Sequence, residues 1–151
     1  MLIDMIKEPG FQELMERHIR ETLFYFLESE HPFGLLCQLE YVTFDPPLPE
    51  DLAARLQEVT LFMIAGYTFE SFEVAGDILF FEAGFGPENF GSVVSMPLLA
   101  VLQLLVEETP VLINLAKPRL DYGERKEEEG IQSSLETFLS NPENRKFLKK
   151  K

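Results

Sequence analysis

The chain has 151 residues, of which 46% are hydrophobic and 14 are phenylalanine, enough to bury the core of one domain. Its formal net charge of −13 repels phosphate backbones and anionic lipids, which excludes nucleic acid and membrane surfaces as expected partners. No apolar run approaches the roughly 20 residues of a spanning helix, and the single cysteine, Cys37, excludes an internal disulfide. We therefore expect a cytoplasmic protein in which Cys37 is buried rather than reactive.

The N-terminal part of the chain has the pattern of an amphipathic helix. Apolar residues recur at spacings of three and four over residues 11–27, and charged residues occupy the positions between them. Pro32 and Gly34 end the pattern. One helix is therefore expected before the first strand.

The middle of the chain is rich in β-branched and aromatic residues, divided by glycine and proline turns. The expected strands are residues 35–44, 59–65, 69–74, 78–85, 90–96 and 111–116. The third and fourth of these should form a hairpin through Ala75-Gly76-Asp77. Proline in the first turn predicts a short helix over residues 49–56 and a longer one over residues 97–108.

The last part of the chain differs from the rest, since residues 119–130 are mostly charged and polar. We therefore expect a domain over residues 1–118 and a charged tail over residues 119–151. Short helices are expected near residues 131–139 and after Ser140. The chain ends in a basic and apolar segment, Phe147-Leu148-Lys149-Lys150-Lys151.

No residue pattern predicts catalysis or metal binding. His18 and His31 have no ligand partner at metal-binding spacing, and residues 84–86 lack the spacing of a dinucleotide loop. Ser92 and Ser95 lie outside any G-x-S-x-G frame. With 26 acidic residues, a carboxylate pair is expected by chance, and an enzyme using such a pair stays open as an alternative. We expect no enzymatic activity, no cofactor and no metal, and instead recognition of an extended peptide at a strand edge.

Three runs in the same order carry a family resemblance. Val59-Thr60-Leu61-Phe62-Met63-Ile64-Ala65 is similar to an "I-V-L-N-I-A" strand, and Phe81-Glu82-Ala83-Gly84-Phe85-Gly86 is similar to "F-x-A-R-F-G-G". Val94-Ser95-Met96-Pro97-Leu98-Leu99-Ala100-Val101-Leu102 is similar to "V-S-V-P-L-A-A-V-L". Residues 19–118 thereby resemble the stringent starvation protein B family, adaptors that deliver tagged polypeptides to the ClpXP protease.

The resemblance implies an α+β, mainly β fold. Its core would be a small bent Sm-like β-barrel with an N-terminal amphipathic helix, to which the pattern of residues 97–108 adds a helix after the penultimate strand. It also implies a homodimer formed through the N-terminal helix, although the apolar face of residues 11–27 could instead cover the barrel.

The resemblance further implies an apolar groove beside residues 81–85. The implied peptide-binding residues are Met63, Ala65, Phe81, Glu82, Ala83, Gly84, Phe85, Val94 and Met96. Since side chains alternate along a strand, only the odd or only the even positions can face the groove. At the end of the tail, Phe147, Leu148 and Lys149 correspond by composition to the segment that docks on the unfoldase.

The chain departs from the family at the centre of this groove. Gly84 stands where the family has arginine, and Glu82 adds a negative charge, so acidic tags lose a cation and meet repulsion. The leading hypothesis is a non-enzymatic adaptor that binds extended peptide tags and delivers their owners to an AAA+ protease. The alternative is an acidic, dimeric secretion-type chaperone that binds partly unfolded effectors.

Overall fold

The computed structural model describes residues 1–118. The helices expected after residue 130 and the docking segment around Phe147, Leu148 and Lys149 lie outside the described residues.

The described chain folds as α+β with two antiparallel sheets of four strands each, as the sequence predicts for the fold class. The helices are α1 (Leu2–Met5), α2 (Pro9–Glu28), α3 (Glu50–Ala53) and α4 (Gly66–Ser71), with one-turn 3-10 helices η1 (Leu39–Tyr41) and η2 (Leu98–Ala100). The strands are β1 (Phe33–Gln38), β2 (Thr43–Asp45), β3 (Val59–Ile64), β4 (Glu73–Ala75), β5 (Ile78–Phe85), β6 (Phe90–Pro97), β7 (Val101–Val106) and β8 (Thr109–Ile113). The first sheet has the order β3-β1-β7-β8 and the second has the order β2-β6-β5-β4.

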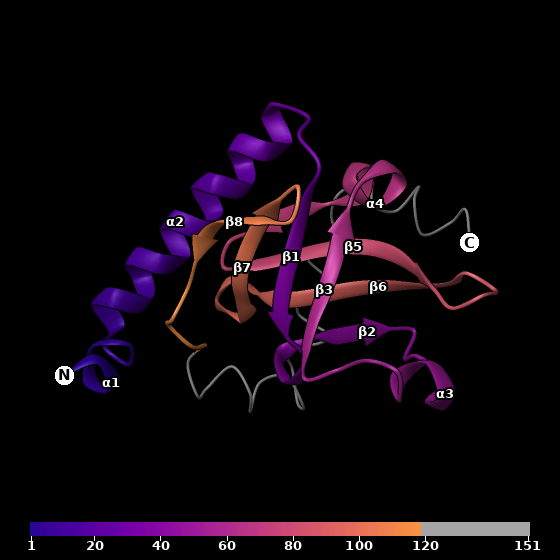
Figure 1. Ribbon diagram of the computed structural model, residues 1–151, viewed down its shortest axis with the longest axis horizontal. Coiled ribbons are helices and arrows are strands. Elements are labelled where there is room, and N and C mark those ends of the chain that lie inside the picture. The colour runs from indigo at the N-terminus through magenta and orange to yellow at the C-terminus, as the bar shows by residue number, and fades with distance from the viewer. Residues whose placement is uncertain (119–151) are drawn as a thin grey trace.

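The chain passes between the two sheets four times, once through the longer connection from β2 to β3 that contains α3 and three times at short helical corners. The element η1 leads from β1 to β2, α4 leads from β3 to β4, and η2 leads from β6 to β7. Figure 1 shows β1 and β3 running crosswise to β5 and β6. Within residues 1–118 no strand of one sheet is paired with a strand of the other, so the two sheets do not close into a barrel.

The predicted N-terminal helix is present as α2, and its apolar face packs against the core of the domain. Ile19 and Leu23 are fully buried, and Pro9 occupies its first turn, where a missing N–H costs nothing. Gln12 Nε2 donates a hydrogen bond of 3.0 Å to the carbonyl oxygen of Lys117, and Arg20 Nε donates one of 3.0 Å to that of Gly76. These bonds tie α2 to the segment after β8 and to the turn between β4 and β5, and α2 also contacts the corner η2.

Aromatic rings fill the space between the sheets. Phe33 in β1 lies 5.3 Å from Phe72, ring centroid to ring centroid, and Phe72 stacks on Phe81 in β5 at 5.8 Å. Phe81 also meets Phe62 in β3 edge to face at 5.3 Å. Each pair adds roughly 0.5–1.5 kcal/mol beyond the burial of its area. The rings therefore connect one sheet directly to the other.

Cys37 is buried in the middle of the first sheet, as expected. It pairs with Thr60 in β3 and Val101 in β7 and has no exposed surface. This burial raises the pKa of the Cys37 thiol far above its ordinary value, because the thiolate would lose its hydration.

The expectation of a strand over residues 69–74 is wrong for most of its length. Gly66 adopts a φ of +58°, which only glycine accepts readily, and the chain then makes the single helical turn α4. The spacing of three between Phe69 and Phe72 lets both rings contact Phe33. Packing on the core thus outweighs the strand propensity of this segment. Only β4 remains, and it forms the expected hairpin with the first residues of β5.

The helix expected over residues 97–108 is also wrong. After the single turn η2 the chain becomes β7, because β1 and β8 satisfy its backbone groups on both sides. A short apolar run fits a buried strand as well as a helix, and here the available edge of β1 decides. Similarly, the strand expected over residues 35–44 is divided into β1 and β2 by η1.

A buried asparagine, Asn114, links the segment after β8 to η2 and β7 by hydrogen bonds. Asn114 is 1% exposed, and its Nδ2 donates to the carbonyl oxygens of Val101 and Ala116, each at 2.9 Å, and of Leu99 at 3.3 Å. Its Oδ1 accepts a hydrogen bond of 2.8 Å from the Ala116 N–H. One side chain therefore holds the segment after β8 against the corner η2.

The turn between β7 and β8 predicts a stabilising substitution. Glu107 and Glu108 have φ angles of 50° and 69°, the left-handed pair typical of a two-residue type I′ turn, in which asparagine and glycine are preferred. The double variant Glu107→Asn/Glu108→Gly should raise the free energy of unfolding by about 1 kcal/mol in urea titrations. As the control, Glu107→Gln/Glu108→Gln removes the same two charges and keeps the unfavourable backbone. An equal gain in both variants would show that charge, not conformation, sets the cost.

Candidate functional site

An open hollow of about 670 Å³ lies between the start of α4 and the second half of β5. Its volume falls within the range of small-molecule and peptide side-chain pockets, roughly 300–1,000 Å³. The residues that line it are Pro46, Tyr67, Thr68, Glu82, Ala83, Gly84, Asn89 and Gly91.

The hollow exists because β4 is shorter than β5. Strand β4 pairs only with the first three residues of β5, up to the Glu73–Phe80 pair, and α4 then lies beside β5 in its place. The Glu82 N–H donates a hydrogen bond of 2.9 Å to Ser71 Oγ at the end of α4. Backbone groups two residues apart point to the same side of a strand, so the N–H and C=O of Gly84 also point away from β6. Among residues 1–118 no strand pairs with Gly84 on that side.

The structure decides which positions of β5 face the core. Leu79 and Phe81 have no exposed surface, and Phe85 packs its ring on Phe44 and Phe62 at centroid distances of 5.7 and 6.5 Å. The odd positions therefore point inward. The even positions, Glu82 and Gly84, point to the opposite face of the sheet, where both line the hollow.

Only part of the set expected from the sequence gathers at the hollow. Three members line it, namely Glu82, Ala83 and Gly84. Phe81, Val94 and Met96 are fully buried in the core, with Phe85 packed against it. Met63 and Ala65 are exposed at β3 and at the start of α4, outside the lining.

Met63 belongs to a different surface. Its sulfur and the side chains of Leu61 and Leu105 converge over Gly34, within 3.3–3.6 Å of where a Cβ would stand. Leu61 is 50% exposed and Met63 is 63% exposed. These side chains form an apolar patch on the outer face of the first sheet, which is separate from the hollow beside β5.

Sequence reasoning missed the residues that complete the hollow from outside β5. Tyr67 and Thr68 come from α4, which the sequence did not predict, and Asn89 comes from the hairpin turn after Gly86. The only sequence signal for these positions is the pair of glycines, Gly66 and Gly86, both of which have positive φ in the structure.

The one charged residue among those of residues 1–118 that line the hollow is an acid, Glu82. Its side chain is 7% exposed. The pKa of the Tyr67 hydroxyl lies above its ordinary value, first because the surrounding protein desolvates the phenolate and then because Glu82 and Glu70 repel it. The site thus favours hydrogen-bond donors and cations over anions.

Asn89 explains why position 84 is glycine. A Cβ on Gly84 would overlap the Asn89 side chain. The backbone of Asn89 donates a hydrogen bond of 3.0 Å from its N–H to the Gly86 carbonyl oxygen and has a φ of 55°, which sets the direction in which the Asn89 side chain leaves the turn. The arginine that the resembling family has at this position therefore does not fit this hairpin as it stands.

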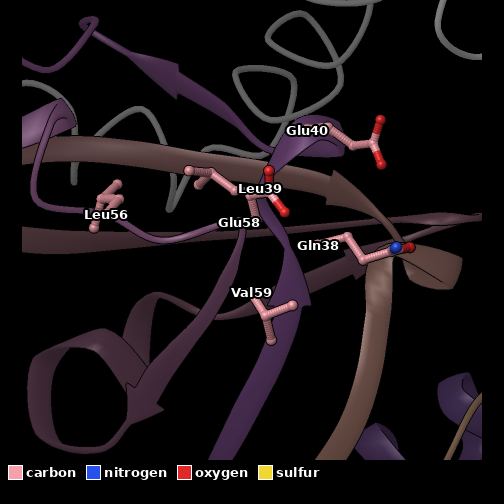
Figure 2. A pocket seen from close by; sticks show the side chains of 6 residues that line it. All are labelled: Gln38, Leu39, Glu40, Leu56, Glu58 and Val59. Atoms are coloured by element: carbon pink, nitrogen blue, oxygen red, sulfur yellow. The ribbon is translucent and has the colours of Figure 1, made fainter.

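A second hollow of about 550 Å³ lies in the first sheet, where β1 ends and β3 begins. Its lining residues are Gln38, Leu39, Glu40, Leu56, Glu58 and Val59. Figure 2 shows Leu56 on one side of it and the side chains of Gln38 and Glu40 on the other. The Leu39 N–H donates a hydrogen bond of 2.8 Å to the Glu58 carbonyl oxygen between them. The two hollows share no residue, and this one contains none of the positions expected to bind peptide.

Residues 1–118 contain no cluster of three or more His, Cys, Asp or Glu side chains arranged to hold a metal ion. Nor do they contain a helix whose length and hydropathy would let it cross a bilayer.

No model of a protein family matches the chain, and no curated protein matches it significantly.

The contact between Gly84 and Asn89 predicts a coupled pair of substitutions. Gly84→Ala should lower the free energy of unfolding by about 1–3 kcal/mol, because the new methyl group displaces the Asn89 side chain. In an Asn89→Gly background, where glycine accepts the positive φ, the same substitution should cost less than about 0.5 kcal/mol. Urea denaturation of the four proteins of this double-mutant cycle measures the coupling. Additive effects would contradict the assigned contact.

Proposed function

We propose that the chain is a non-enzymatic adaptor that binds extended peptide tags and delivers their owners to an AAA+ protease such as ClpXP. The observation that carries this proposal is the hollow beside β5, where the backbone edge at Gly84 adjoins a cavity large enough for peptide side chains. It lies at the strand that resembles the "F-x-A-R-F-G-G" motif of the stringent starvation protein B family. Such a function requires no catalytic group.

The proposed binding mode combines backbone and side-chain contacts. A peptide in extended conformation would exchange hydrogen bonds with the N–H and C=O of Gly84, which gives affinity without regard to sequence. Its alternate side chains would enter the hollow between Tyr67 and Asn89, which gives specificity. Tyr67 is 51% exposed and offers an aromatic surface at the entrance.

The arrangement of the sheets supports the proposal at the level of the fold. We propose that the two sheets and the three corners η1, α4 and η2 correspond to the bent Sm-like barrel of the family, opened between the sheets. The helix α2 corresponds to the family's N-terminal helix.

Delivery follows from tethering. A bound client stays near the protease, so its effective concentration rises and a modest peptide affinity suffices. We assign the docking role to Phe147, Leu148 and Lys149 near the basic end of the chain.

The proposal predicts that filling the hollow abolishes peptide binding. Peptides selected from a randomised, fluorescein-labelled decapeptide library should bind the full chain specifically in fluorescence anisotropy. Thr68→Trp should weaken this binding at least about tenfold, because the indole occupies the hollow. Adding the full chain should also accelerate ClpXP degradation of a fluorescent protein that carries a selected peptide, and Thr68→Trp should remove the acceleration.

The matched control is Thr109→Trp, which places the same ring on exposed β8 in the other sheet. Binding that survives Thr68→Trp, or that Thr109→Trp weakens equally, would contradict the assignment of the site. Equal binding of unrelated unfolded proteins, without acceleration of proteolysis, would favour the secretion-type chaperone instead.

We also propose that the chain is a homodimer through α2. Leu14, His18 and Tyr25, at spacings of four and seven, share one stripe of the helix, where Leu14 is 47% and Tyr25 is 67% exposed. In a dimer whose twofold axis passes through this stripe, the same stripe of the second copy would cover both apolar side chains.

The dimer predicts a change of mass in solution. Leu14→Lys/Tyr25→Lys should shift the protein from dimer to monomer in sedimentation equilibrium, since burying four ammonium groups costs several kcal/mol. Glu13→Lys changes the net charge by the same amount on another part of α2 and should leave the dimer intact. A wild-type chain that sediments as a monomer would overturn the proposal.

A further inference from the structure

We infer that the hollow beside β5 selects peptides that place a lysine or arginine side chain next to Glu82. This inference rests on the proposed function, and it names the class of client that the same site would accept.

The position of Glu82 is the first reason. Its backbone N–H is fixed by Ser71 Oγ at 2.9 Å, and its side chain lies on the same face of β5 as Gly84, two residues further on. A peptide strand placed along the edge at Gly84 would bring its side chains within roughly 5–8 Å of neighbouring positions on that face, which is in reach of a long basic side chain.

The chemistry of the lining is the second reason. A carboxylate offers about four lone-pair sites on two oxygens, so it can accept bonds from an ammonium or a guanidinium group in addition to other contacts. At 7% exposure Glu82 is shielded from solvent, and such shielding strengthens the attraction of a cation and the repulsion of an anion. Glu70, whose charge also acts on Tyr67, adds to the negative field.

The shape of the hollow is the third reason. Its volume of about 670 Å³ admits the long stem of lysine or arginine. The half-exposed ring of Tyr67 can pack against this stem or take up a cation–π contact with its head. Gly84 and Asn89, which also line the hollow, are uncharged.

The test compares the peptides selected by wild-type chain and by Glu82→Gln, both as full-length protein. Wild type should enrich lysine or arginine at one peptide position, and Glu82→Gln should not. For a selected peptide, replacing this residue with glutamine should weaken binding to wild type about tenfold, the effect expected of one charge-assisted hydrogen bond. The same replacement should change binding to Glu82→Gln less than about twofold.

The control separates this site from the general acidity of the chain, which has 26 acidic against 13 basic residues. Glu58→Gln removes one charge at the second hollow and should keep the preference of wild type. An equal loss of preference in both variants, or none in Glu82→Gln, would overturn the inference.

The remaining outcomes distinguish this inference from the proposed function. Selected peptides that Thr68→Trp excludes but that carry no basic residue would leave the adaptor proposal standing and overturn the inference. The absence of any selected peptide would overturn both. Because replacing the basic residue of the peptide is measured on wild type alone, the test holds even if Glu82→Gln fails to fold.

Discussion

The contact of Phe81 with Phe62 and Phe72 is the constraint on which the rest of the structure depends. It joins β5 of one sheet to β3 of the other. Within residues 1–118 no strand of one sheet is hydrogen-bonded to a strand of the other, so side-chain packing of this kind must hold the sheets together. Because Phe81 must point inward, the pleat sends Glu82 and Gly84 outward. The core thereby sets which side chains a ligand can meet.

The sequence predicted the elements whose periodicity is unambiguous. The amphipathic pattern located α2, and alternation between turn residues located β3, β5 and β6 nearly to their ends. The failures at α4 and β7 have one physical cause. In each, a short apolar segment fits helix and strand equally well, and its partner, Phe33 for α4 and the edge of β1 for β7, is distant in the sequence.

The candidate site was predictable only in outline. The family resemblance pointed to residues 81–85, but alternation alone left two orientations, and only packing excludes Phe81 from the hollow. Tyr67 and Thr68 could not be foreseen because their helix was not. Asn89 could be foreseen as a turn residue, yet its position over Gly84 follows from the hairpin geometry. A strand can thus be located from sequence, whereas a cavity needs the neighbours that the fold supplies.

Because Cys37 is buried, its reaction with a thiol reagent reports the opening of the first sheet. As the one thiol in the chain, at the centre of β1 between β3 and β7, it meets a water-soluble alkylating reagent only when this sheet separates. Its raised pKa keeps it unreactive until then. The rate of alkylation therefore measures how often the first sheet opens, without any added label, and a ligand that binds only the closed form would slow it.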